Sequence, residues 1–214
     1  MTLLNYMRIG TLTGVGLLAL TACSNPEKTA RYLIDPPPAI GQVPNRLGTA
    51  ELKDVSLPGY ASDEEVAYQT PDGAVRSSPR NLWADNPERA FTLTLARAIS
   101  DASGATVIGE PWPLAEPPQR VLEVRVERAL AQANNTYRLS GRYFVSDDRG
   151  GGTNHARNFD IVVPMQSESP GQTAAAASQA ISLLAQQIAT LSGPGRTIAT
   201  QTQPDPFADL EPLF

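Results

Sequence analysis

The most regular alternation of hydrophobic and polar residues in the chain lies between Arg120 and Glu127. Leu122, Val124 and Val126 fall on one side of this pattern, and charged residues fill the positions between them. Successive side chains of a β-strand point to opposite faces, so the alternation predicts a strand with one face on the core. We expect the three aliphatic side chains to be buried.

The same alternation recurs twice further along the chain. It covers residues 137–145 and residues 159–163, which follow candidate turns at Asn134-Asn135 and Gly150-Gly151-Gly152. Short turns connect antiparallel strands, whereas parallel strands need a long crossover. The pattern therefore predicts three successive antiparallel strands.

Two segments repeat their apolar residues at helical spacing. The first begins at Asn86, a residue type that caps helices, with Pro87 at the first helical position and Gly104 as the stop. The second runs over residues 172–191, before Gly193-Pro194 ends it. The repeating residues are Phe91, Leu95, Ala98, Ile99 and Ala102 in the first segment and Ala177, Ile181, Leu184, Ile188 and Leu191 in the second. Each helix should lay one apolar face on the sheet.

Shorter elements are predicted in the rest of the chain. A hairpin is expected from Glu65 to Ser77, because Thr70-Pro71-Asp72-Gly73 at its centre has the residue types of a tight turn. We further expect strands at residues 32–34, 49–57 and 105–108 and a loop at residues 111–118. Together these elements predict an α+β fold, with a mostly antiparallel sheet and two main helices packed on one face.

The N-terminus has the organisation of a lipoprotein signal peptide. Arg8 precedes an apolar run from Ile9 to Leu20, which leads into Leu20-Thr21-Ala22-Cys23. Twelve helical residues reach only about 18 Å, too short for a hydrocarbon layer of about 30 Å. We predict cleavage after Ala22 and attachment of acyl chains such as palmitate to Cys23. The alternative is an ordinary secretory signal, or an apolar start that arose by chance, in which Cys23 is incidental.

These features predict four regions along the chain. Residues 1–22 form the signal peptide, 23–30 a tether, 31–192 a single periplasmic domain and 193–214 a disordered tail. The residue after Cys23 is Ser24 and not an aspartate, so the expected location is the periplasmic face of the outer membrane.

Charge narrows the possible partners. The chain has 17 lysines and arginines against 22 acidic residues, and loss of residues 1–22 removes one arginine and no acid. A chain of this charge, in which no lysine and arginine cluster stands out, is a poor nucleic-acid binder, so no nucleic-acid partner is expected.

The inventory of reactive side chains predicts no enzyme. His155 is the only histidine and Cys23 the only cysteine, so neither a histidine metal cluster nor a free thiol nucleophile is expected. Gly150-Gly151-Gly152 lacks the lysine of a phosphate-binding loop. We expect no catalytic residues, no metal site and no cofactor. His155 is interpreted as a solvent-facing or strand-end residue, with a lone acid or base as the alternative.

Several short motifs together resemble one known family. They are the lipobox at Cys23, Tyr32-Leu33, Val55-Ser56-Leu57-Pro58-Gly59-Tyr60, and Trp83-Ala84-Asp85 before the first helix. In order and spacing, over roughly residues 32–191, this set resembles the PqiC (YmbA) family. These proteins are lipoproteins described as auxiliary components of ABC-type transport.

The resemblance implies a non-enzymatic role in lipid transport between the inner and outer membranes, in support of envelope integrity. The implied partners are an MCE-domain protein and an inner-membrane permease, together with the outer membrane through the acyl chains. A homo-oligomer is a further possibility. The alternative is a structural or assembly lipoprotein of another envelope machine, for secretion or lipopolysaccharide assembly.

Leu57, Pro58, Tyr60 and Trp83 are the candidate partner contacts, together with the hairpin that follows them. A tight Pro-Gly turn presents side chains rigidly, and loops carry function more often than core strands do. One departure from the family concerns this element, because the family often reads Leu-Asp-Arg after the tyrosine, where this chain has Ala61-Ser62-Asp63.

Overall fold

The computed structural model describes residues 28–39, 41–147 and 152–199 of the chain. The predicted signal peptide, Cys23 and most of the predicted tail lie outside these residues. In chain order the described elements are β1 (Ala30–Tyr32), β2 (Thr49–Leu52), α1 (Gly59–Ser62), β3 (Tyr68–Gln69), β4 (Val75–Arg76), β5 (Asn81–Trp83), α2 (Pro87–Ser103), β6 (Thr106–Gly109), β7 (Arg120–Gln132), β8 (Thr136–Asp147), β9 (Thr153–Pro164), α3 (Pro170–Ala189) and β10 (Gly195–Ala199).

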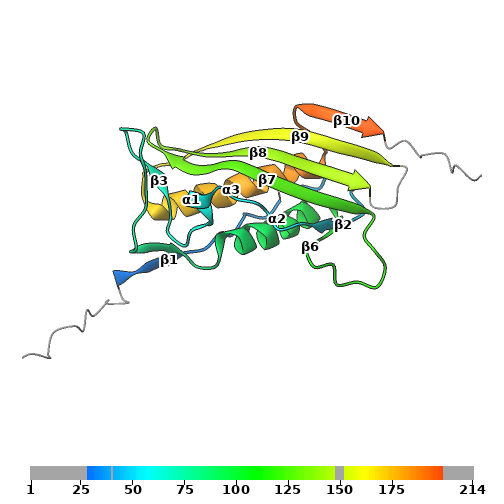
Figure 1. Cartoon of the computed structure of the whole chain (residues 1–214), viewed down its shortest axis with the longest axis horizontal. Coiled ribbons are helices and arrows are strands. Elements are labelled where there is room, and N and C mark those ends of the chain that lie inside the picture. The colour runs from blue at the N-terminus through cyan, green and yellow to red at the C-terminus, as the bar shows by residue number, and fades with distance from the viewer. Residues whose placement is uncertain (1–27, 40, 148–151, 200–214) are drawn as a thin grey trace, which may run out of the picture.

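Three long antiparallel strands, β7, β8 and β9, form the centre of the main sheet (Figure 1). The strand order along this sheet is β10-β9-β8-β7-β2-β6. Leu122 lies opposite Val145 and Val124 opposite Tyr143, and all four side chains are fully buried. The alternation in the sequence therefore gave the correct face of the sheet.

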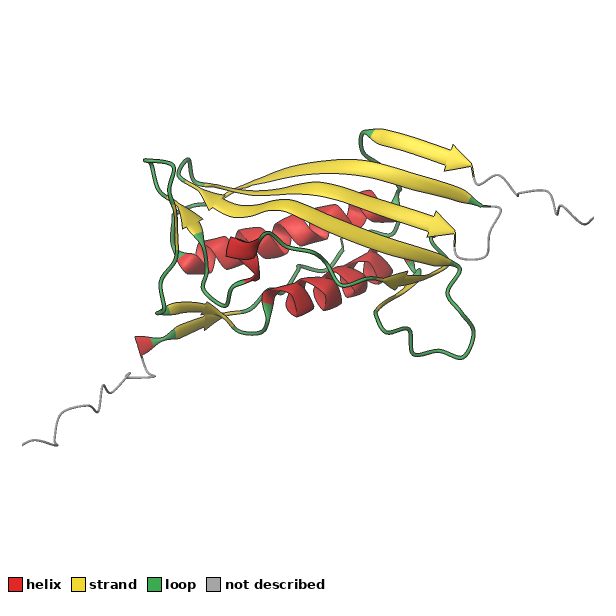
Figure 2. Cartoon of the chain, viewed as in Figure 1, coloured by secondary structure: helices red, strands yellow, loops and turns green. Residues whose placement is uncertain are grey.

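Both long helices lie on the same face of this sheet (Figure 2). Leu95 and Ile99 of α2 and Ile181, Leu184 and Ile188 of α3 are fully buried. The predicted α+β fold is thus confirmed, with α2 and α3 as its main helices.

The ends of the helices follow from local capping chemistry. The side chain of Asn86 accepts a hydrogen bond from the backbone N–H of Arg89, and Gly104 has a left-handed conformation with φ of 68°. Glycine adopts this conformation without the steric cost that a Cβ would impose. Ser169 caps α3 in the same way as Asn86 caps α2. The predicted start and stop of the first helix are confirmed.

A β-bulge near Glu127 keeps one face of β7 on the core along its whole length. The pairing with β8 shifts between Val126 and Arg128, so the inward positions change from even-numbered to odd-numbered residues. Ala129 and Ala131 are consequently buried after the bulge. An extra residue of this kind is what a bulge inserts into one strand of an antiparallel pair.

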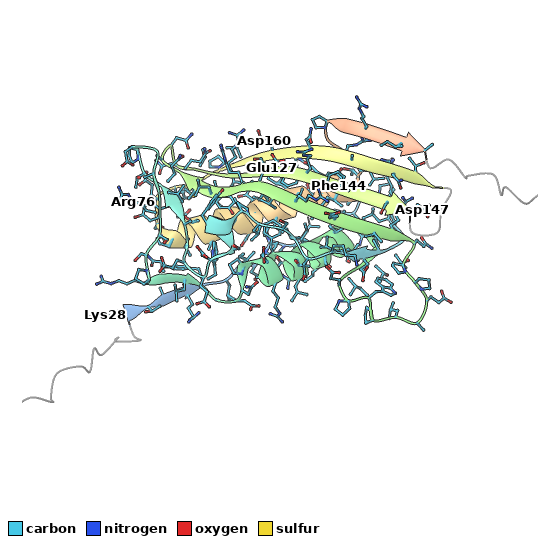
Figure 3. The ribbon with its side chains drawn as sticks, viewed as in Figure 1. Lys28, Arg76, Glu127, Phe144, Asp147 and Asp160 are labelled. Carbon is cyan, nitrogen blue, oxygen red and sulfur yellow. The ribbon has the colours of Figure 1, made fainter. Side chains whose placement is uncertain are left out.

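The opposite face of the sheet carries charged residues, among them Glu127 and Asp160 (Figure 3). Arg138 forms a double hydrogen bond with Asp160, at 2.8 and 2.6 Å. The guanidinium of Arg125 lies 5.2 Å from the ring centre of Phe144. This face is therefore the solvated side of the sheet.

Parallel pairings add to the antiparallel centre. β2 pairs with both β6 and β7 in parallel, and β1 pairs with β5 in a separate parallel sheet. The predicted strand at residues 49–57 is shorter than expected, because β2 ends at Leu52 and only Ser56 makes a further bridge to β7.

Two predictions about local structure are wrong. The predicted tight turn at Pro58-Gly59 is the start of α1, a single helical turn in which the backbone amides of Ala61 and Ser62 donate to the carbonyl of Pro58. The predicted disordered tail begins too early, because Gly195–Ala199 forms β10 on the edge of β9. Backbone pairing holds β10, and its exposed side chains gave no apolar pattern to detect.

Candidate functional site

The free edge of β7 is covered by the segment that follows β2. The backbone N–H of Lys53 donates to the carbonyl of Leu122 at 2.9 Å, and Ser56 exchanges hydrogen bonds with the carbonyl of Val124 and the amide of Val126. An unpaired strand edge exposes backbone donors and acceptors, so this coverage closes the edge along the first half of β7.

The side chain of Tyr60 covers the next part of the β7 edge, where the backbone leaves the sheet to form α1. Its hydroxyl accepts a hydrogen bond from the backbone N–H of Ala129, at 3.3 Å. Two residues further along β7, Ala131 pairs with Tyr68 of β3. The tyrosine of the Leu-Pro-Gly-Tyr motif thus takes the place of a strand partner between two backbone pairings.

A small apolar hollow lies beneath α1. It has a volume of about 20 Å³, which is room for about one water molecule. Its lining residues are Ile34, Leu57, Ala61, Ala67, Trp83, Pro87, Phe91, Ala129, Tyr137 and Thr173. Burial raises the pKa of Tyr137 well above its usual range, so the phenol stays neutral. A hollow of this volume is too small to hold a lipid.

The structure gives three of the four predicted contact residues a role in packing. Trp83 belongs to the core with 8% of its surface exposed, and Leu57 packs against the same core while partly exposed. Tyr60 bonds to β7, as described above. Pro58 is partly exposed and precedes the first residue of α1. Contact of these residues with a partner remains a prediction, and the buried Trp83 would act in it by positioning its neighbours.

The hairpin formed by β3 and β4 presents apolar side chains to solvent. Tyr68 is 36% exposed and Val75 is 44% exposed. Tyr68 lies opposite Arg76 and Val75 opposite Gln69, so the two side chains point to opposite faces of the hairpin, and we call these two residues together the hairpin patch. The turn is held by Asp72, whose carboxylate accepts hydrogen bonds from the Thr70 hydroxyl and the Ala74 amide; both lower its pKa. The sequence predicted this hairpin. It did not predict the exposure of Tyr68 and Val75, because strands of two residues are too short to show an alternation of apolar and polar positions.

The hairpin and the N-terminal end of the described chain lie at the same end of the molecule. Figure 3 shows Arg76 of β4 and Lys28, the first described residue, at one end and Asp147 at the other. A lipid anchor N-terminal to Lys28 would therefore attach the domain to the membrane at the end that carries the hairpin patch.

His155 lies at the opposite end, on β9. Its Nδ1 is 3.3 Å from the hydroxyl of Thr197, its direct partner on β10. Burial lowers its pKa, and the positive charges of Arg157 and Arg120 lower it further. His155 was expected to face solvent or to lie at a strand end; it lies near the start of β9, is partly buried and links β9 to β10.

Neither a metal site nor a membrane-spanning helix is found among the described residues. No group of histidine, cysteine, aspartate and glutamate in this part of the chain is arranged to hold a metal ion. Among the helices described, none is long and apolar enough to cross a membrane.

Comparison with solved structures shows the fold. One crystal structure, of an uncharacterized protein, matches with a TM-score of 0.59 and 19% identity over 71% of this chain and 97% of the other. A second, of a DUF330 protein from Xanthomonas campestris, matches with a TM-score of 0.54 and 12% identity over 73% of this chain and 91% of the other. A search of curated proteins finds no match.

Comparison with family models identifies the chain. The model described as "ABC-type transport auxiliary lipoprotein component" matches residues 32–189, which extend from the end of β1 to the end of α3. The match includes the hairpin patch and all of the long strands. The chain therefore belongs to the family of ABC-type transport auxiliary lipoproteins.

Proposed function

We propose that this protein is a docking subunit of an MCE-type lipid transport system, which moves lipids between the inner and outer membranes and supports envelope integrity. Acyl chains on Cys23 hold it on the periplasmic face of the outer membrane. Its partners are an MCE-domain protein and, through that protein, an inner-membrane permease. It holds a position in this assembly and catalyses no reaction.

The match to the transport auxiliary family over residues 32–189 is the observation that carries this proposal. An auxiliary role agrees with the residues near α1, which pack against the core or bond to β7. The hollow beside them is too small for a lipid substrate. The choice of an MCE-domain protein as the partner rests on the resemblance of the motifs to the PqiC family.

The hairpin patch is the proposed contact with the MCE-domain protein. Tyr68 and Val75 expose apolar surface on the two faces of the hairpin, whereas core packing accounts for Leu57 and Trp83. Aromatic residues are enriched in protein interfaces, because they bury a large area at small entropic cost. α1 and Tyr60 brace the base of this surface against β7.

Co-purification from envelopes tests the proposal. The full-length protein, extracted in mild detergent, should bring down an MCE-domain protein and its permease, both identified by mass spectrometry. Tyr68→Asp and Val75→Asp should each reduce this recovery by roughly tenfold, which corresponds to about 1.4 kcal/mol of binding free energy.

Leu114→Asp is the matched control, because Leu114 is 52% exposed on the loop between β6 and β7. This variant should retain the partner. Reproducible recovery of a secretion or lipopolysaccharide-assembly machine in place of an MCE-domain protein would support the alternative function.

A further inference from the structure

A shallow apolar groove lies between the segment after β1 and the exposed side of α2. Its volume is about 140 Å³, and a cavity of about 150 Å³ holds a benzene ring in another protein. Leu33, with 71% of its surface exposed, and Leu93, with 47% exposed, stand at the groove. The other lining residues are Tyr32, Ile34, Trp83, Ala84, Asp85, Ala90 and Thr94.

We call this feature the Leu33–Leu93 groove. Ion pairs neutralise Asp85, the carboxylate that lines it, and Asp35, which follows the lining residue Ile34 in the chain. Arg89 and Arg97 lie one helical turn before and after Leu93 on α2; Arg89 pairs with Asp85, and Arg97 pairs with Asp35 at 2.8 Å. Arg31 adds a third guanidinium, which donates to the carbonyl of Trp83 at 3.4 Å. The rim therefore carries a small positive excess and does not repel anionic headgroups.

The groove lies close to the predicted anchor along the chain. Ala30 lies seven positions after Cys23, and even a fully extended chain of seven residues reaches only about 25 Å. Leu33 follows β1 directly. A bilayer that holds acyl chains on Cys23 is thus within reach of the groove at all times, at a high effective concentration.

We propose that the Leu33–Leu93 groove is the contact of this domain with the bilayer that carries its own lipid anchor. Leu33 and Leu93 enter the boundary between headgroups and acyl chains, and the paired arginines stay at the headgroup level. The contact fixes the orientation of the domain on the membrane. This inference depends on Cys23 as the anchor, as proposed above, but not on the identity of the transport partner.

Trp83 lines the groove and provides a natural probe of this contact. The acylated full-length protein, carrying Trp112→Phe so that Trp83 is the only tryptophan, is reconstituted into phosphatidylethanolamine and phosphatidylglycerol vesicles. Bromine atoms on the acyl chains quench indole emission at short range. Emission should fall by about half relative to vesicles without bromine, because interfacial contacts reach about 5–10 Å into the boundary region.

Leu33→Asp and Leu93→Asp should each restore the emission, since a carboxylate opposes entry into the apolar layer. Leu114→Asp is the matched control and should leave the quenching unchanged. Both leucines of the groove are exposed, so these variants should keep the urea midpoint of the parent protein. A second control carries Trp83→Phe and keeps Trp112, which lies on the loop between β6 and β7 and should not be quenched.

Equal emission with and without bromine, from protein that still floats with the vesicles, would overturn the proposal. Protein that fails to float would overturn it as well, by removing Cys23 as the anchor. We expect Leu33→Asp and Leu93→Asp to lose the quenching and still to recover the MCE-domain protein in full. This result would show that the membrane contact is separate from the hairpin patch.

Discussion

The hydroxyl of Tyr60 accepts a hydrogen bond from the backbone N–H of Ala129, across 3.3 Å and 69 positions of the chain. This bond fastens α1 to β7 at the point where no backbone segment reaches the strand edge. A tyrosine that the sequence offered as a surface contact thus has a structural role in closing the sheet.

Tyr60→Phe removes only this acceptor and keeps the ring. We expect the free energy of unfolding to fall by about 1 kcal/mol, because a partly buried amide loses its partner. Urea denaturation measures the change. Tyr68→Phe, at an exposed tyrosine of the same end, should shift the free energy by less than about 0.5 kcal/mol. Equal effects of the two variants would contradict the role given to the hydroxyl.

Gly141 faces the bulge in β7 so closely that a side chain does not fit. A Cβ at this position would lie 2.2 Å from the carbonyl oxygen of Arg125, and backbone atoms cannot move away cheaply. Gly141→Ala should therefore cost about 2 kcal/mol or more in unfolding free energy. At Gly59 the added Cβ meets no atom within 4 Å, so Gly59→Ala should be nearly neutral. A stable Gly141→Ala variant would show that the bulge is placed wrongly.

His155 should make stability depend on pH below neutrality. Its folded-state pKa lies below the ordinary value of 6.5, so the unfolded chain binds the proton more readily. The contribution is complete above about pH 6.5 and is lost as the pH falls through the folded-state pKa. Glu110 and Asp160, whose pKa values are lowered from 4.5 and 3.8, titrate below this window.

The measurement is the urea midpoint at about pH 7.5 and about pH 5.5, on either side of the ordinary histidine pKa. His155→Asn, which does not titrate, should show a smaller decrease between the two conditions than the parent protein. An unchanged decrease would mean that other groups cause the pH dependence.

Cys23→Ala should yield an unprocessed or soluble product, because the thiol is the predicted acceptor of the acyl chains, and stable anchoring needs two lipid signals. Mass spectrometry of the mature N-terminus checks the prediction. Ser24→Ala, one residue further on, should still be acylated and cleaved. A mature chain that begins elsewhere than at an acylated Cys23 would contradict the lipoprotein assignment of this residue.

Local chemistry was enough to predict much of the fold. The Asn86 cap, the Gly104 stop and the burial of Leu122 and Val124 depend on residues within one element, and the structure agrees with all of them. Composition alone also showed that the chain has one histidine and one cysteine, too few for a cluster of these residues. These features are local because hydrogen bonds at helix ends and the period of a strand involve only nearby residues.

Contacts between distant segments were decided by the tertiary structure alone. The bulge at Glu127 depends on which residue of β8 lies opposite, and β10 exists because β9 offers a free edge. Tyr60 likewise meets Ala129 only when α1 lies beside β7. Such features depend on pairing partners far apart in the chain, and the periodicity of a single segment carries no information about its partner.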